Sequence, residues 1–337
     1  MKKGIVLFAV AVFVLFTPEA VFAQRNRPIE VRLASPMPRN SDWGRILDRM
    51  SAEWARVTNN EVRLRVIHDG VEGGEAKSLS SLSTNNIQAS LFTSFGLTAI
   101  CPGVMTLSVP FMIANDNELD LVLQSVLPVL EEQVNRTNFV VIAWSKAGWV
   151  NVFSKDPVLV PDDLRRHRVA TNPESGDFNM AFKTMGFHMV ETEIVDTGTR
   201  LANNMINAIY QTPAAVAPLG MHRTLTNMLD IPIAPFMGAI VMNRVTWNRL
   251  SPERQRQLVA VTRQIAADFD ATMPRTVANA VTMMQREGLR VNRPNNEQQA
   301  LWRAEVLRAM PSLLGTTFDR DIYQRINVIL ERSRSGQ

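Results

Sequence analysis

Residues 251–288 have the sequence SPERQRQLVAVTRQIAADFDATMPRTVANAVTMMQREG and predict one very long helix. Ser251 is a suitable N-cap, Pro252 fits the first helical position, and Gly288 is a typical stop. Pro274 in the middle predicts a kink or an interruption. At the usual rise per residue the helix is about 55 Å long, more than the diameter of either half of the protein. The helix must therefore cross both halves, which favours two lobes that close on a ligand.

Strands and helices alternate before this helix. Residues 29–34, 61–68 and 88–94 have the character of strands, and residues 42–57 carry apolar side chains at helical spacing with Ser41 available as a cap. A second run of short strands and helices begins at about residue 150. This alternation predicts the α/β class, with mostly parallel sheets covered on both faces.

The first 23 residues have the features of a signal peptide. Lys2 and Lys3 precede an apolar run, and a small-residue cleavage site ends at Ala23. The alternative, a retained membrane anchor, is disfavoured because the run is shorter than the ~20 residues of a spanning helix. We expect cleavage after Ala23 and a periplasmic mature protein.

The composition argues against several kinds of site. Cys101 is the single cysteine among 337 residues, so neither an internal disulfide nor a cysteine-based zinc site can form, and its default role is that of a buried small hydrophobe, with a dimer-forming thiol as the alternative. The four histidines are scattered, so we expect no metal and no cofactor. The net charge of +4 is spread along the chain, unlike the clustered basic stripe of a nucleic-acid-binding protein.

One acidic segment raises the possibility of an enzyme. Glu72 and Glu75 lie in the glycine-rich segment DGVEGGE (69–75), where an exported hydrolase could use a carboxylate. The favoured interpretation is a turn whose acidic residues cap the following helix. We therefore expect that the protein is not an enzyme.

Six segments in order resemble the solute-binding component of a TRAP transporter, a family 7 extracellular solute-binding protein. They are VRLASPMPRNSDW, GVEGGEAKSLSSLSTNNIQASL, LSVPFM, PVLVPDDLRRHRVAT, FKTMGFHMV and MNRVTWNRLSPERQRQL. The resemblance implies a two-domain clamshell of the periplasmic-binding-protein type (type II-like), with a long helix spanning both domains. The domains implied are 28–147 plus 236–275, and 148–235 plus 276–337.

The resemblance also implies how a ligand is held. Members of the family usually bind an organic acid through an arginine on the strand after the P-x-D-L turn, by bidentate pairing with the carboxylate. Alignment of MAFKTMG with the family helix places Ala170 at that position. Arg168, two residues earlier on the same strand face, is the alternative occupant.

Two other positions lack the charge that the family often has. Gly148, Trp149 and Val150 stand where the family has a G-x-R step, and a loop that includes Gln211 and Thr212 is also uncharged. Because an unpaired carboxylate is costly to bury, these differences favour a neutral or apolar cleft.

From these observations we expect a TRAP-type import protein that binds a predominantly hydrophobic small molecule and delivers it to a membrane permease. The alternative is the same role with an organic acid clamped by Arg168, and an interaction protein with a vestigial cleft is a third possibility. A periplasmic tetratricopeptide-repeat protein is a further expected partner, by resemblance. The expected ligand-binding residues are Met37, Glu75, Ser94, Phe95, Trp149, Val150, Arg168, Ala170, Gln211, Thr212, Phe236 and Met237.

Overall fold

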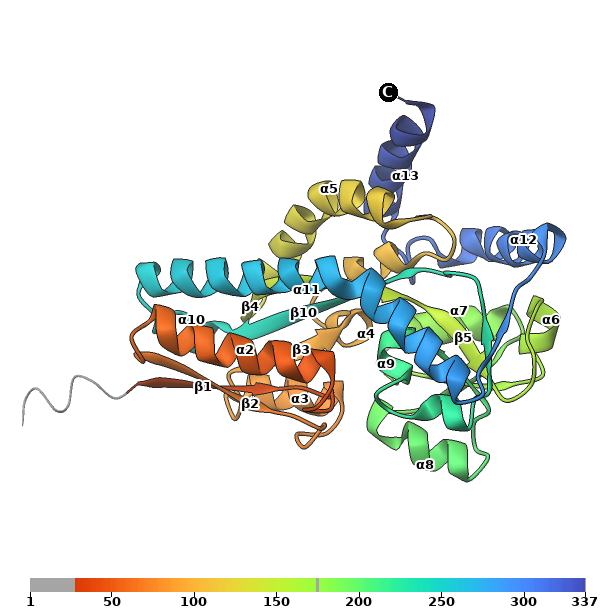
Figure 1. Cartoon of the computed structure of the whole chain (residues 1–337). Helices are drawn as coiled ribbons and strands as arrows, with labels where there is room; N and C mark the ends of the chain where they lie inside the picture. The colour runs from red at the N-terminus through yellow and green to blue at the C-terminus, as the bar shows by residue number, and fades with distance from the viewer. Residues whose placement is uncertain (1–27, 174–175, 337) are drawn as a thin grey trace, which may run out of the picture.

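The computed structural model describes residues 28–173 and 176–336 (Figure 1). The expected signal peptide and its cleavage site after Ala23 lie outside these ranges. Within them, no helix combines the length and the apolar character needed to cross a membrane.

The first lobe is built on a five-stranded sheet with the order β2-β1-β3-β10-β4. β1 pairs in parallel with β2 and β3, whereas β10 is antiparallel to β3 and β4. The strands are β1 (Ile29–Ala34), β2 (Val62–Ile67), β3 (Ala89–Thr93), β4 (Phe139–Trp149) and β10 (Pro235–Asn243).

Helices cover both faces of this sheet. α2 (Asp42–Val57) and the long α11 (Pro252–Arg286) pack on one face, and their contact includes a buried hydrogen bond from Trp54 Nε1 to Thr262 Oγ1 at 2.8 Å. Ser41 caps α2 by accepting from Gly44 N at 3.1 Å, as the sequence predicts. The other helices of this lobe are α3 (Glu75–Ser83), α4 (Ser94–Leu97), η1 (Pro102–Ser108), α5 (Asp116–Asn135) and α10 (Arg244–Trp247).

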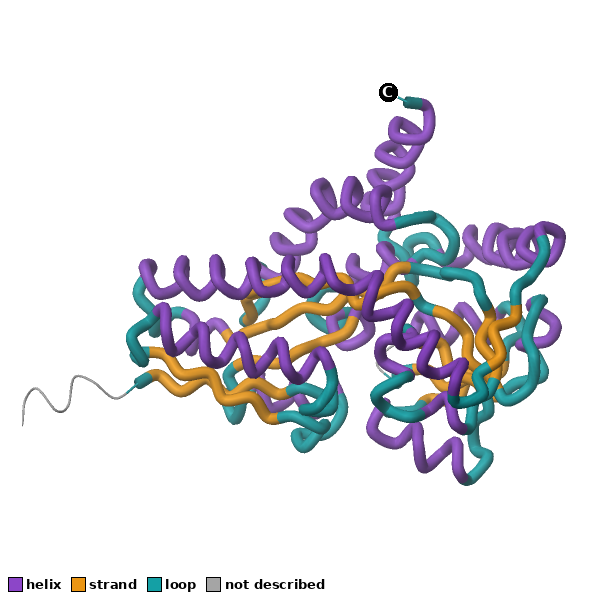
Figure 2. Tube along the Cα trace, viewed as in Figure 1, coloured by secondary structure: helices purple, strands orange, loops and turns teal. Residues whose placement is uncertain are grey.

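The second lobe is built on a six-stranded sheet with the order β11-β9-β5-β8-β6-β7. Figure 2 shows its strands as a group separate from those of the first lobe. The strands are β5 (Asn151–Ser154), β6 (Arg168–Thr171), β7 (His188–Glu191), β8 (Ala208–Gln211), β9 (Asn227–Leu229) and β11 (Arg290–Asn292). The helices are α6 (Pro161–Leu164), α7 (Gly176–Thr184), η2 (Ile194–Asp196), α8 (Thr197–Ala202), α9 (Pro213–Val216), η3 (Met221–Arg223) and α12 (Asn296–Leu313).

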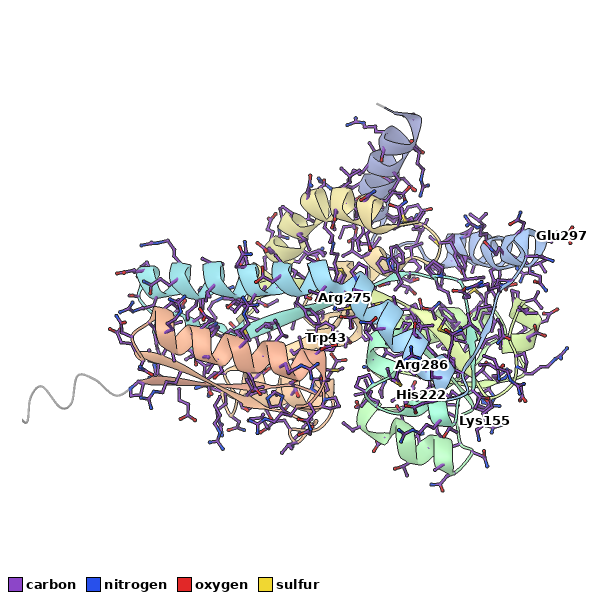
Figure 3. All side chains as sticks on the ribbon, in the orientation of Figure 1. Trp43, Lys155, His222, Arg275, Arg286 and Glu297 are labelled. Atoms are coloured by element: carbon purple, nitrogen blue, oxygen red, sulfur yellow. The ribbon has the colours of Figure 1, made fainter. Side chains whose placement is uncertain are left out.

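α11 lies across both lobes, which confirms the expectation from residues 251–288 (Figure 1). Ser251 caps it, accepting from Arg254 N at 3.3 Å. The helix continues through Pro274 without interruption and changes direction near Arg275 (Figure 3). The bend is the expected effect of a proline, which removes one backbone hydrogen bond and crowds the preceding turn.

The chain also crosses between the lobes through two extended segments, which lie side by side. Val150 N donates to Ala234 O at 2.9 Å, and Ile233 N donates to Val150 O at 2.9 Å. Gly148, just before the first crossing, has a φ of +93°, which a residue with a side chain adopts only with strain. This paired ribbon and α11 both connect the two lobes.

The last helix corrects one expected boundary. α13 (Arg320–Ser335) packs against α5 and η1 of the first lobe, although residues 276–337 were all expected in the second. Its apolar face, with Ile322, Ile326 and Leu330, is buried there, and Arg334 forms an ion pair of 2.8 Å with Glu118 of α5. A single boundary at residue 276 assigns all later residues to the second lobe, whereas α13 packs against the first lobe.

The attachment of α11 to β4 predicts a pH-dependent stability. Asp270 accepts from Ser145 Oγ at 2.7 Å and from Lys146 N at 3.0 Å, and burial raises the pKa of Asp270 from 3.8 to about 6. The native state therefore holds this proton more tightly than the unfolded state, so this group makes the protein less stable as the pH rises from about 4 to about 6.

We expect D270N to raise the free energy of unfolding at pH 7.5, by no more than about 3 kcal/mol, and to reduce the gain in stability on acidification to pH 5. Urea denaturation at the two pH values measures both effects. E253Q, at an exposed position in the first turn of the same helix, is the control. A less stable D270N with an unchanged pH profile would contradict the prediction.

Candidate functional site

A cavity of about 110 Å³ lies between the two lobes. Its lining residues come largely from the carboxyl ends of parallel strands: Met37 follows β1, Thr93 ends β3, Asn172 follows β6, and Thr212 follows β8. Loops at the carboxyl ends of parallel strands are the usual place for ligands in α/β proteins. Two such edges face each other here, which makes this cavity the candidate binding site.

The lining is mainly apolar. Phe95 is central to it, with ring centroids 5.5 Å from those of both Phe178 and Phe236. Trp43, labelled at the beginning of α2 in Figure 3, packs edge-on against Phe269 of α11 at 4.5 Å. The apolar and aromatic lining residues are Pro36, Met37, Trp43, Leu91, Phe92, Phe95, Ala147, Ala170, Ile194, Ile209, Tyr210, Ala215, Met221, Phe236 and Met237.

Glu75, the first residue of α3, is a buried carboxylate in the cavity wall. One oxygen accepts from Thr93 N at 2.5 Å, and the other accepts from Thr93 Oγ1 and from Asn172 Nδ2, both at 2.8 Å. The Asn172 bond joins the two lobes across the cleft. Charge-assisted bonds of this kind compensate the cost of burying the carboxylate.

The charged side chains that line the cavity, in the described part of the chain, are all acidic. Among the described lining residues, Glu75 and Glu193 carry carboxylates and none is arginine, lysine or histidine. The remaining polar lining consists of hydroxyl and amide side chains: Thr93, Thr171, Asn172, Thr192, Thr197, Gln211 and Thr212. The wall therefore offers neutral donors and acceptors, and no positive charge, to a ligand.

The structure brings eight of the twelve expected ligand-binding residues to this cavity: Met37, Glu75, Phe95, Ala170, Gln211, Thr212, Phe236 and Met237. Three of the others make structural contacts instead. Ser94 Oγ donates to Met237 O at 3.1 Å, Trp149 Nε1 donates to Asp116 Oδ1 at 2.9 Å, and Val150 is buried in the crossover ribbon.

Arg168 is the fourth residue that does not line the cavity. Its guanidinium donates to Met205 O at 3.1 Å and to Asn204 O at 2.5 Å. Arg168 begins β6, whereas the cavity lies at the carboxyl end of that strand. Ala170, two residues further along, reaches the cavity.

Several lining residues were absent from the expected set, among them Trp43, Asn172, Glu193 and Tyr210. Asn172 directly follows β6 and Glu193 is the second residue after β7, so the carboxyl ends of the predicted strands were the signal that points to them. Tyr210 was adjacent to the expected Gln211. Its hydroxyl is buried without a hydrogen-bond partner in the described part of the chain, and burial raises its pKa.

The other reactive groups lie away from the cavity. Cys101 is fully buried, its thiol donates to Leu130 O at 3.6 Å, and burial raises its pKa to about 12. Across residues 28–173 and 176–336, no cluster of three or more histidine, cysteine, aspartate or glutamate side chains could hold a metal ion.

A model of the family described as bacterial extracellular solute-binding protein, family 7, matches residues 33–313. No curated protein matches the chain significantly.

Solved structures of TRAP periplasmic solute-binding proteins have the same fold. One, from Xanthobacter autotrophicus Py2 with bound β-D-galacturonate, has a TM-score of 0.82 at 15% identity, covering 89% of this chain and 98% of that one. Another, from Shewanella oneidensis with bound succinate, has a TM-score of 0.84 at 12% identity, covering 90% and 99%. A sugar-acid-binding protein from Advenella mimigardefordensis in complex with galactonate has a TM-score of 0.84 at 11% identity, covering 91% and 99%. These likenesses confirm the predicted two-domain α/β clamshell.

The Glu75–Asn172 bond predicts how closure responds to charge. N172D replaces the amide donor with a second carboxylate beside Glu75, so we expect repulsion across the cleft and a loss of about 1–3 kcal/mol in stability. Small-angle X-ray scattering should show a larger radius of gyration, and thermal unfolding a lower Tm. N203D, an exposed site of the same lobe, should change neither quantity. An equally compact and equally stable N172D would refute a role of this bond in closure.

Proposed function

Because the chain belongs to the family 7 bacterial extracellular solute-binding proteins, we propose that it is the binding component of a TRAP-type transporter. In this role it captures a small molecule between its lobes and delivers it to a membrane permease. The family match over residues 33–313 carries the proposal, and the cavity between two hinged lobes supports it. A tetratricopeptide-repeat partner and cleavage after Ala23 stay predictions.

Family membership also makes the chain a binding protein rather than an enzyme, as expected from the sequence. The contacts of Glu75 agree with this role. Its two oxygens accept from Thr93 and Asn172, so the carboxylate stabilises the β3–α4 turn and the closed cleft instead of acting as a hydrolytic base.

For the ligand, the lining supports an uncharged, predominantly hydrophobic small molecule. Burial against the aromatic wall contributes about 25 cal/mol per Å² of apolar surface, which is enough to offset association costs for a ligand of modest size. A buried carboxylate without a cation costs several kcal/mol, and the described lining offers none.

An organic acid is the second candidate. The ligands named for the three solved structures are galacturonate, succinate and galactonate, and they favour the organic-acid alternative over the hydrophobic ligand. In this chain such an acid would meet the neutral donors of Gln211, Thr212 and Asn172. It would reach Arg168 only if that guanidinium left the carbonyls of Asn204 and Met205.

Native mass spectrometry of the exported protein, purified without added ligand and followed by solvent extraction, tests the ligand class. Recovery of an apolar, uncharged molecule is the expected result. Recovery of a small organic acid would establish the second candidate, and failure to bind any solute on subsequent titration would contradict the transport role itself.

Two substitutions on β6 separate the candidates. We expect R168A to leave the affinity for the extracted ligand within about twofold, because Arg168 lies outside the cavity. A170R, which brings a guanidinium into the cavity, should weaken binding of an uncharged ligand by at least about tenfold and allow binding of succinate. Isothermal titration measures both. Loss of ligand binding in R168A would show that this arginine is the clamp.

A further inference from the structure

Glu193, which follows β7 in the second lobe, places its carboxylate against the first lobe. A β-carbon added to Gly74 would lie 2.1 Å from Glu193 Oε2 and 2.5 Å from Oε1, so the carboxylate lies directly on the Gly74 backbone. Both residues line the cavity. The contact therefore spans the cleft at the wall of the binding site.

Gly74 is the N-cap of α3, a helix of nine residues, and it provides no capping side chain. The first backbone N–H groups of a helix lack partners within the helix, and together with the helix dipole they attract anions. In this protein, the group next to that position is a carboxylate from the opposite lobe. A ligand carboxylate arriving at the start of α3 would have to displace Glu193.

Neighbouring contacts hold the same side of the cleft closed. Val195, two residues after Glu193, lies over Gly70, because a β-carbon added there would be 2.6 Å from its Cγ1. Asn172 donates to Glu75, the residue after Gly74, at 2.8 Å. The turn at residues 70–75 thus meets the second lobe at three points.

We propose that Glu193 is a specificity-determining residue: its carboxylate occupies the anion position at the start of α3 when the lobes close, and so excludes anionic ligands. The inference rests on the proposed transport function and assigns its ligand to the uncharged class. An anionic ligand would face the repulsion of Glu193 and Glu75 together, whereas an uncharged ligand leaves the contact at α3 intact.

The probes are succinate and its uncharged diamide, succinamide, measured by isothermal titration. We expect E193A to bind succinate at least about tenfold more tightly than the wild type, since the position at α3 is then open to the ligand carboxylate. E193Q keeps the shape of the side chain without its charge, so its affinity for succinate should lie between those of E193A and the wild type. Affinity for succinamide should not rise in either variant. E191Q removes the same charge from an exposed site at the end of β7, and should keep the wild-type values within about twofold.

A second variant acts on the contact without changing any charge. Gly74 has a φ of −72°, so G74A is conformationally permitted, but its methyl group displaces the Glu193 carboxylate. We expect ligand-free G74A and E193A to show a larger radius of gyration than the wild type in small-angle scattering. G198A, at a glycine with no atom within 4 Å of the added methyl, is the control.

The outcomes separate this inference from the proposed function. Tight succinate binding by the wild type overturns both the uncharged ligand class and the role of Glu193. If the wild type rejects succinate, and E193A and G74A are as compact and as selective as the wild type, only the role of Glu193 is overturned. Circular dichroism melting of each variant verifies that it is folded.

Discussion

The pairing of the two crossover segments is the constraint on which the rest of the structure depends. Val150 exchanges hydrogen bonds with Ile233 and Ala234, and α11 bridges the same two lobes beside them. A paired ribbon and a helix can bend, but they do not allow the lobes to separate or rotate freely. The carboxyl edges of the two sheets consequently face each other, and the loops that follow the strands form the cavity.

The chemistry of the cavity depends on the contacts of its two carboxylates, Glu75 and Glu193. Glu75 is satisfied by donors from both lobes, and Glu193 lies at the start of a helix that has no cap of its own. Both carboxylates thus stabilise the closed arrangement. The described lining contains these two carboxylates and no cationic side chain.

Local patterns predicted the elements well and the site in part. Ser251, Pro252 and the apolar spacing identified α11, because caps and periodicity are properties of neighbouring residues. Ala170 and Gln211, which were expected from the resemblance to the family, line the cavity together with Phe236. Trp149 and Val150 were placed in the site by the same resemblance, but in the structure the Trp149 indole donates to Asp116 and the Val150 backbone pairs with Ile233 and Ala234.

The sequence by itself determined the α/β class and the long helix across both lobes, since alternating elements, caps and apolar periodicity are properties of residues close together in the chain. Only the tertiary structure decided that Arg168 caps backbone carbonyls, that α13 returns to the first lobe, and that Glu193 meets Gly74. These contacts join segments that are up to about two hundred residues apart. Which residues meet in these contacts depends on how the two lobes and the distant helices pack together, and no local sequence pattern encodes that packing.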